Sequence, residues 1–124
     1  GGGFEELLSS GYSFVSYPLR VVIRLYPRGE KDFPARIAVS VSKRRFKRAV
    51  KRNRVKRLIR ETYRLNKNIL YSYIPEDKTM DILFIYLHDE IFEYGKIEKA
   101  ITGAIKKIRS YIEKDGSGDI ADTH

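Results

Sequence analysis

The spacing of hydrophobic and polar residues along this chain follows two periods, which separate strands from helices. Residues 36–42 alternate larger apolar side chains with alanine and serine, which is the two-residue period of a half-buried strand. Residues 19–26 are rich in β-branched and aromatic side chains and predict a second strand. Residues 12–17 are aromatic and extended, and Pro18 ends them. Residues 80–87 are almost continuously apolar, which predicts a central strand covered on both faces.

Other segments show the longer period of an α-helix. Residues 97–112 repeat isoleucine and alanine every three or four positions, which predicts a helix with one apolar stripe. Residues 4–10 predict a short first helix that stops at Gly11. The segment that runs to Lys67 is also amphipathic. Its predicted core flank consists of Val55, Leu58, Ile59, Thr62, Leu65 and Ile69.

The order of these elements is helix, three strands, helix, strand and helix. It predicts an α+β fold in which three helices cover one face of a small, mostly antiparallel sheet of about four strands. The opposite face should be partly open, and an open face that carries aromatic rings could hold a ligand. We expect residues 1–114 to form a single domain and residues 115–124 to form a disordered tail.

The positive charge of the chain is concentrated in one segment. The chain has 25 Lys and Arg against 16 Asp and Glu, a net charge of +9. Residues 43–60 alone hold 11 of these cations, which leaves 14 basic and 16 acidic side chains elsewhere. On the helix, Lys56, Arg57, Arg60 and Arg64 fall opposite the apolar flank, with Asn53 among them. A concentrated block of cations is typical of a polyanion-binding site.

A charged run can also be an ordinary solvated helix face. Like charges four residues apart cost about 0.2–0.5 kcal/mol each, however, and pairs such as Arg48/Arg52 and Lys56/Arg60 are relieved only by Glu61. A bound nucleic acid explains this pattern better. A face of Lys and Arg with Asn53 as its lone amide suits the phosphates of a folded RNA more than base edges. Asn53 could equally be a surface amide or bond to the local backbone.

Composition narrows the remaining classes of protein. A chain of 124 residues suits one domain, and the absence of cysteine excludes disulfides and thiolate metal sites. The longest apolar run, residues 82–87, is too short to span a bilayer, and the first residues lack the features of a signal peptide. We expect a cytoplasmic protein without a membrane partner.

Three other functions stay open from the residues alone. An enzyme acting by itself would have little material, because His88-Asp89-Glu90 is better explained as a turn after a strand than as a metal or acid–base site. A structural RNA binder, such as a ribosomal protein, fits the same composition. An amphipathic membrane helix fits poorly, since the apolar flank of the basic helix is needed by the sheet.

Two strings in the basic segment resemble the signature of bacterial ribonuclease P protein subunits. The first is Ser40-Val41-Ser42-Lys43, at the end of a predicted strand. The second runs AVKRNRVKRLIRE from Ala49 to Glu61. In that family a strand ending in S-V-S-K leads into a helix that carries R-N-R and then K-R-L-I-R. The flanking elements agree in outline with the same family.

The resemblance implies a fold, a function and partners. The fold would be α-βββ-α-β-α with a left-handed βαβ crossover, a rare exception to the usual hand. The protein would be the accessory subunit of ribonuclease P, inactive alone, which pairs with a catalytic RNA to remove the 5′ leader of precursor tRNA. Mg²⁺ ions bound mainly by the RNA and its substrate would carry the catalysis. Outside this ribonucleoprotein the protein would be a monomer.

The resemblance also assigns residues to two surfaces. The surface against the catalytic RNA would consist of Lys43, Arg52, Asn53, Arg54, Lys56, Arg57 and Arg60. The leader would cross the open sheet face beside the first helix, in a cleft formed by Phe4, Leu8, Tyr12 and Phe14. Base stacking on such rings tolerates any sequence, as a leader binder requires. Core packing is the alternative explanation for Phe4, Leu8 and Phe14. No catalytic or metal-binding residue is assigned to the protein.

Overall fold

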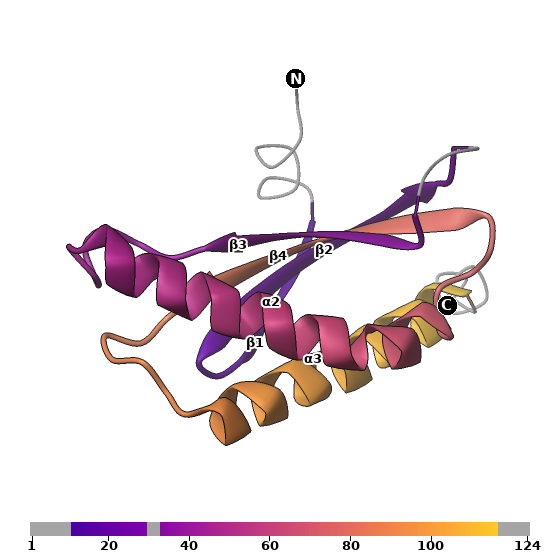
Figure 1. The fold of residues 1–124 in the computed structure, drawn as a ribbon. Helices are drawn as coiled ribbons and strands as arrows, with labels where there is room; N and C mark the ends of the chain where they lie inside the picture. The colour runs from indigo at the N-terminus through magenta and orange to yellow at the C-terminus, as the bar shows by residue number, and fades with distance from the viewer. Residues whose placement is uncertain (1–10, 30–32, 117–124) are drawn as a thin grey trace.

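The computed structural model describes residues 11–29 and 33–116, which form one four-stranded sheet and two helices (Figure 1). The strands are β1 (Tyr12–Ser16), β2 (Leu19–Pro27), β3 (Ala35–Ser40) and β4 (Lys78–Tyr86). The helices are α2 (Ala49–Tyr71) and α3 (Tyr94–Gly116). The four strands and the two long helices predicted from the periodicity are therefore confirmed, with small shifts of their ends.

The predicted count of three helices is not borne out. The described residues contain two helices, and the helix predicted at residues 4–10 lies outside them. Helix α2 also begins after the run of cations has started, because residues 43–48 form a loop before it. At the other end, α3 continues to Gly116. Residues 115 and 116 of the predicted tail are thus helical, and the rest of it lies outside the described residues.

The sheet is mixed rather than antiparallel throughout. Its strand order is β1-β2-β4-β3, in which β1 and β4 each pair with β2 in antiparallel register. In contrast, β3 pairs with β4 in parallel, with Ala35 opposite Met80 and Ser40 opposite Ile85. Parallel neighbours need a long connection, and the 23 residues of α2 supply it. The left hand expected for this crossover stays a prediction.

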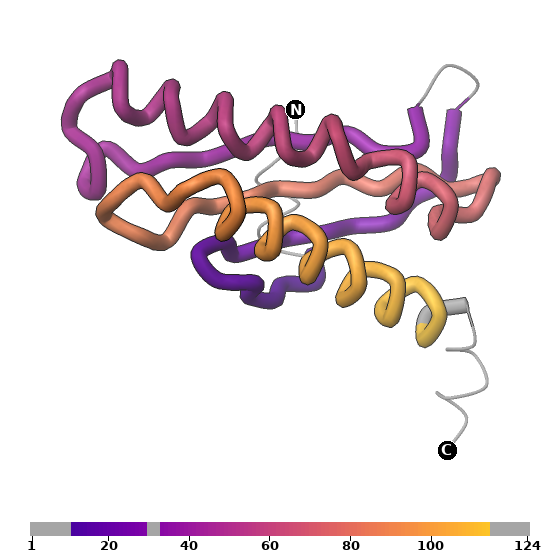
Figure 2. The backbone as a smooth tube through the Cα atoms, turned by 60° about the horizontal axis from the view of Figure 1, so that its bottom comes forward, coloured from indigo at the N-terminus to yellow at the C-terminus, as the bar shows by residue number. Residues whose placement is uncertain are grey.

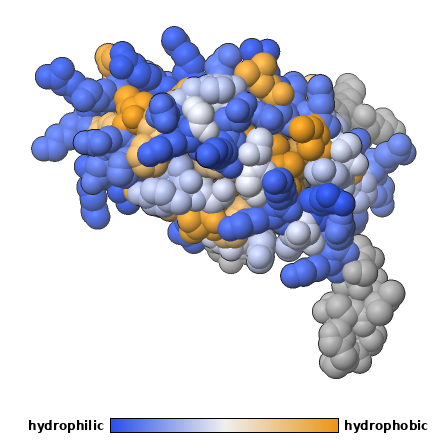
Figure 3. Space-filling model, turned by 90° about the horizontal axis from the view of Figure 1, so that it is seen from below, coloured by the Kyte–Doolittle hydropathy of each residue, from blue (hydrophilic) through white to orange (hydrophobic). Residues whose placement is uncertain are grey.

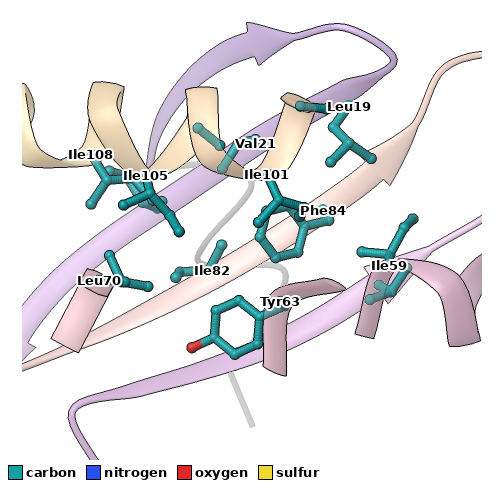
Figure 4. Close-up of a cluster of buried hydrophobic side chains, with 14 of the residues drawn as sticks. Leu19, Val21, Ile59, Tyr63, Leu70, Ile82, Phe84, Ile101, Ile105 and Ile108 are labelled. Carbon is teal, nitrogen blue, oxygen red and sulfur yellow. The ribbon is translucent and has the colours of Figure 1, made fainter. Parts of the chain in front are cut away.

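Both helices lie side by side on one face of the sheet, as predicted (Figures 1 and 2). The core fills the space between them and the strands (Figure 4). From the sheet, Val21, Ile82 and Phe84 point into it, and α3 contributes Ile101 and Ile105. Burial of apolar area at roughly 25 cal/mol per Å² makes this layer the main source of stability. It also fixes which side of each helix remains free for a partner.

The core flank of α2 differs from the predicted one at two positions. Leu65 is 60% exposed and Ile69 is 51% exposed, whereas Tyr63 and Leu70 are buried. The buried direction of the helix is set by Val55, Tyr63 and Leu70 together, because α2 must face both the sheet and α3. Leu65 and Ile69 are turned away from that direction.

The opposite face of the sheet has a small apolar centre and a polar end. Val22 is 1% exposed and Leu83 is 6% exposed, so the middle of this face is not free to bind a ligand. At the polar end, Arg36 Nε donates to Asp81 Oδ1 at 3.1 Å, and the Tyr26 hydroxyl donates to the same oxygen at 2.9 Å. Burial raises the pKa of Tyr26, and the Asp81 carboxylate raises it further. This face was predicted to be partly open, but its centre is buried.

Candidate nucleic-acid interface

Three of the six predicted RNA-binding cations lie on the solvent side of α2. Arg54, Arg57 and Arg60 are exposed, as is Asn53 beside them. Within residues 11–29 and 33–116, no carboxylate pairs with these arginines. The one acidic residue of α2, Glu61, accepts a hydrogen bond from Arg64 Nη2 at 3.1 Å. The charge of this face is therefore left for a partner to neutralise.

The start of α2 adds to the positive potential. Arg48 occupies the N-cap without a side-chain hydrogen bond, and the first turn contains no acidic residue. The free N–H groups of a helix N-terminus carry partial positive charge, which favours an anion nearby. Hydrophilic side chains project at the end of the molecule where α2 begins (left in Figure 3).

A shallow depression lies on this face of the helix. It has a volume of about 280 Å³ and is lined by Val50, Asn53, Arg54 and Arg57. The Asn53 side chain makes no hydrogen bond to the described part of the chain, so its amide is free to meet a ligand. We define Asn53, Arg54, Arg57 and Arg60 as the basic face of α2.

Two of the predicted residues do not share this exposed face. Lys56 and Arg52 are half-buried on the flank of α2. Arg52 Nη1 donates hydrogen bonds to the carbonyl oxygens of Phe46 at 2.8 Å and of Lys47 at 2.9 Å. The sequence groups Arg52 with the predicted phosphate-binding cations, but in the structure its Nη1 donates to the protein's own backbone.

The loop that Arg52 holds carries several of the cations. We call residues 43–48 the basic loop. It begins with exposed Lys43, and the Ser42 side chain accepts a hydrogen bond from the Arg44 N–H at 3.0 Å. Phe46 is buried, with its ring centroid 6.0 Å from that of Tyr86. The loop is thus fixed at both ends, so its charges are presented with little ordering cost on binding.

A second candidate surface lies at the opposite edge of the sheet, between β1 and α3. It is a pocket of about 480 Å³ lined by Tyr12, Phe14, Lys107, Ser110, Tyr111 and Lys114. The rings of Tyr12 and Tyr111 are stacked, with centroids 4.7 Å apart. Lys107 Nζ donates to the Val15 carbonyl at 2.6 Å and lies 5.6 Å from the centre of the Phe14 ring. Aromatic faces and cations together suit an unpaired nucleotide strand.

Two of the residues predicted to form the leader cleft lie on a different face of the sheet from the one expected. Tyr12 and Phe14 pair with Ile23 and Val21 in register, so they point to the side of the sheet that carries the helices. They therefore do not lie on the opposite face, where the cleft was expected. Phe14 also packs against the core, as its alternative explanation required. Phe4 and Leu8 lie outside the described residues.

Sequence reasoning missed the part of this pocket that comes from α3. Lys107 and Tyr111 lie more than 90 residues from β1 in the chain, and only the docking of α3 brings them together. The one sequence signal for this part of the pocket was that Lys107 and Tyr111 lie beside the isoleucine stripe of the predicted helix. In the part of the chain that the structure describes, no group of three or more His, Cys, Asp or Glu side chains could hold a metal ion. Neither described helix could span a membrane.

Comparisons with known proteins support the resemblance seen in the sequence. The family model described as Ribonuclease P matches residues 2–109. The ribonuclease P protein component of Porphyromonas gingivalis is 43% identical over 105 residues, which are 84% of this chain and 76% of that protein. The corresponding protein of Chlorobaculum tepidum is 43% identical over 70 residues, 56% of this chain and 43% of its own length.

Solved structures show the same fold. The RNase P protein of Thermotoga maritima superposes with a TM-score of 0.65 at 24% identity, covering 85% of this chain and 90% of that one. A structure of the Staphylococcus aureus RNase P protein gives a TM-score of 0.65 at 24% identity, with 87% and 90% covered. The chain therefore belongs to the ribonuclease P protein family and is the accessory protein subunit of an endoribonuclease ribonucleoprotein, formed with ribonuclease P RNA, that processes the 5′ ends of tRNA.

Proposed function

We propose that the basic face of α2 and Lys43 bind phosphates of the ribonuclease P RNA, while the β1–α3 pocket binds the 5′ leader of precursor tRNA. The observation that carries the first part is the lack of any internal carboxylate partner for Arg54, Arg57 and Arg60 within the described residues. Charges that the protein leaves unpaired on a rigid helix release counterions when they meet phosphates.

The leader assignment rests on the chemistry of the pocket. Tyr12 and Tyr111 offer ring surface to bases of any identity, and Lys107 and Lys114 supply charge for the backbone. Stacking on an aromatic ring is worth about 1–3 kcal/mol per base and tolerates every base. A leader of variable sequence needs that tolerance.

We propose that the metal ions belong to the RNA and its substrate rather than to the protein. The donor set agrees with this view, since the described residues bring no three metal-binding side chains together. Mg²⁺ held by RNA would act as a Lewis acid and activate the attacking water. The protein's own residues then neutralise charge and position the two RNAs. We further propose that the free protein is a monomer and that it works in the cytoplasm.

The test is reconstitution with a ribonuclease P RNA, followed by measurement of RNA affinity over a range of salt concentrations. Arg57→Ala and Arg60→Ala should each weaken binding and reduce the slope of log K against log salt by about 0.7–0.9, the value for one phosphate contact. Lys106→Ala is the matched control, because Lys106 is an exposed cation on α3 and not on α2. Equal slopes for all three variants and the wild-type protein would refute the phosphate role.

A further inference from the structure

Three connections meet at one end of the molecule. The β1–β2, β3–α2 and β4–α3 connections all gather there, at the left of Figures 1 and 2. The first contains Tyr17, and the third contains His88 and Phe92. His88 is the residue whose sequence context suggested a metal or acid–base site. In the structure it belongs instead to a cluster of rings.

The rings of this cluster are held in fixed positions. A hydrogen bond of 3.0 Å joins the Tyr17 hydroxyl to His88 Nδ1, and the His88 tautomer decides which group donates. His88 stacks on Phe92 with centroids 4.2 Å apart, while Lys96 Nζ lies 4.7 Å from the Phe92 ring centre. The Phe92 ring is therefore in contact with both His88 and Lys96.

Tyr17 is exposed and meets its neighbouring rings only edge-to-face. Tyr17 meets Phe92 and His88 in tilted, edge-to-face contacts with centroids 6.1 Å away in both cases. In neither contact does a ring of the cluster stack on Tyr17. Tyr17 is 58% exposed although its hydroxyl is anchored. A large ring that is both exposed and fixed loses little entropy when a second ring stacks on it.

The neighbouring charges indicate which partner would supply that second ring. Arg45 Nη1 binds Asp89 Oδ1 at 2.8 Å, which ties the β4–α3 connection to the basic loop. The exposed cations of that loop are Lys43, Arg44, Lys47 and Arg48, and Lys43 belongs to the surface assigned to RNA. Lys96 adds a cation beside Phe92. An RNA strand would gain both stacking of a base on the ring and neutralisation of its phosphates.

We propose that the exposed face of Tyr17 is a stacking platform for one unpaired RNA base, separate from the β1–α3 pocket. This inference rests on the proposed function, because it takes RNA to be the ligand of the adjacent basic loop. Two RNAs could supply the base. If ribonuclease P RNA supplies it, the site contributes to assembly of the ribonucleoprotein; if precursor tRNA supplies it, the site contributes to substrate binding.

The test compares Tyr17→Leu and Tyr17→Phe in two binding measurements, of the protein to ribonuclease P RNA and of the assembled ribonucleoprotein to precursor tRNA. Tyr17→Leu should weaken one of them roughly 5- to 100-fold, the range for loss of one stacked base. Tyr17→Phe keeps the ring and should stay within about threefold of wild type, since the hydroxyl contributes only the His88 hydrogen bond. The salt slope should not change, because stacking involves no phosphate.

The matched control is Tyr94→Leu, which removes a tyrosine of similar exposure from the start of α3. Ultraviolet crosslinking of the wild-type complexes, with mapping of the modified peptide, gives a readout that needs no variant and decides if Tyr17→Leu fails to fold. A crosslink at Tyr17 is expected. Wild-type affinity of Tyr17→Leu for both RNAs, or an equal loss in Tyr94→Leu, would overturn the inference, as would the absence of the crosslink.

The same experiment separates this inference from the proposed function. Arg57→Ala is measured beside the Tyr17 variants. If Arg57→Ala weakens RNA binding and Tyr17→Leu does not, only the stacking platform is refuted. If neither variant has an effect, RNA binding by this end of α2 is refuted as well.

Discussion

Arg52 fastens helix α2 to the backbone of Phe46, with its Nη1 donating to the Phe46 carbonyl oxygen at 2.8 Å. The same nitrogen donates to the Lys47 carbonyl oxygen at 2.9 Å. Two carbonyls that would otherwise need water are satisfied by this one nitrogen, which carries two N–H groups. Arg52 is therefore a positioning residue for the basic loop, in contrast to its exposed neighbour Arg54.

This contact predicts different behaviour for two arginines that are two positions apart in α2. Arg52→Ala should destabilise the fold by about 1 kcal/mol and weaken RNA binding without changing the salt slope, because no phosphate contact is lost. Arg54→Ala should leave stability unchanged and reduce the slope by about 0.7–0.9. Urea unfolding gives the free energy of unfolding, and affinity at several salt concentrations gives the slope.

Arg52→Lys distinguishes geometry from charge at this position. Lysine keeps the charge, but its ammonium sits on a flexible stem without the pre-organised geometry of the guanidinium, so the stability of this variant should lie close to that of Arg52→Ala. Wild-type RNA affinity in Arg52→Lys, together with a reduced slope in Arg52→Ala, would instead place a phosphate on Arg52.

The β1–α3 pocket predicts an effect that depends on the leader. Tyr111→Ala should weaken the binding of precursor tRNA to the ribonucleoprotein by roughly 5- to 100-fold, because one stacking surface is lost. Binding of mature tRNA, which lacks the leader, should not change. Tyr94→Ala is the control, since it removes an exposed tyrosine that does not line the pocket. An equal loss for both tRNAs in Tyr111→Ala would remove the leader from this pocket.

Phe14 shares the pocket but should behave differently from Tyr111. Its ring is half-buried and packs against the core. Phe14→Ala should therefore lower the free energy of unfolding by about 2 kcal/mol, less than the 3–5 kcal/mol typical of a fully buried phenylalanine. Phe84→Ala, which empties a fully buried position, is the reference. A larger loss of stability in Phe14→Ala than in Phe84→Ala would contradict this order.

The features that sequence could predict are those with a local cause. The alternation in residues 36–42 and the isoleucines of residues 97–112 identify β3 and α3 because periodicity reflects the burial of one face. The charge of α2 is likewise local, and the exposed Arg57 and Arg60 lie where the amphipathic pattern puts them.

The features that sequence could not predict depend on tertiary contacts. Alternation shows that Tyr12 and Phe14 share a side of β1, but only the pairing with β2 shows which side that is. The role of Arg52 depends on a loop carbonyl, which has no signature in the sequence. The rotation of 100° per residue in a helix places Leu65 on the predicted apolar flank. It stays exposed because of where α3 packs.

Two buried tyrosines predict opposite effects of removing a hydroxyl. The Tyr63 hydroxyl is buried and has no hydrogen-bond partner in the part of the chain that the structure describes. The Tyr86 hydroxyl donates to the Glu90 carbonyl oxygen at 2.7 Å and accepts from the Phe92 N–H at 3.0 Å. Tyr63→Phe should therefore raise the free energy of unfolding at pH 7 by about 1 kcal/mol. Tyr86→Phe should lower it by a similar amount.

The pH dependence of stability adds a second test of Tyr63. Burial raises the pKa of Tyr63, and the nearby Tyr71 raises it further, so the folded protein holds this proton more tightly than the unfolded chain does. The resulting stability is fully present below the unfolded pKa of about 10 and is lost as the pH rises above it. Tyr63→Phe has no hydroxyl that could ionise at this position, so this variant does not lose that stability as the pH rises. Urea unfolding between about pH 9 and pH 11 should show a shallower decline for Tyr63→Phe than for wild type, and parallel curves would show that the Tyr63 hydroxyl is not held neutral by the fold.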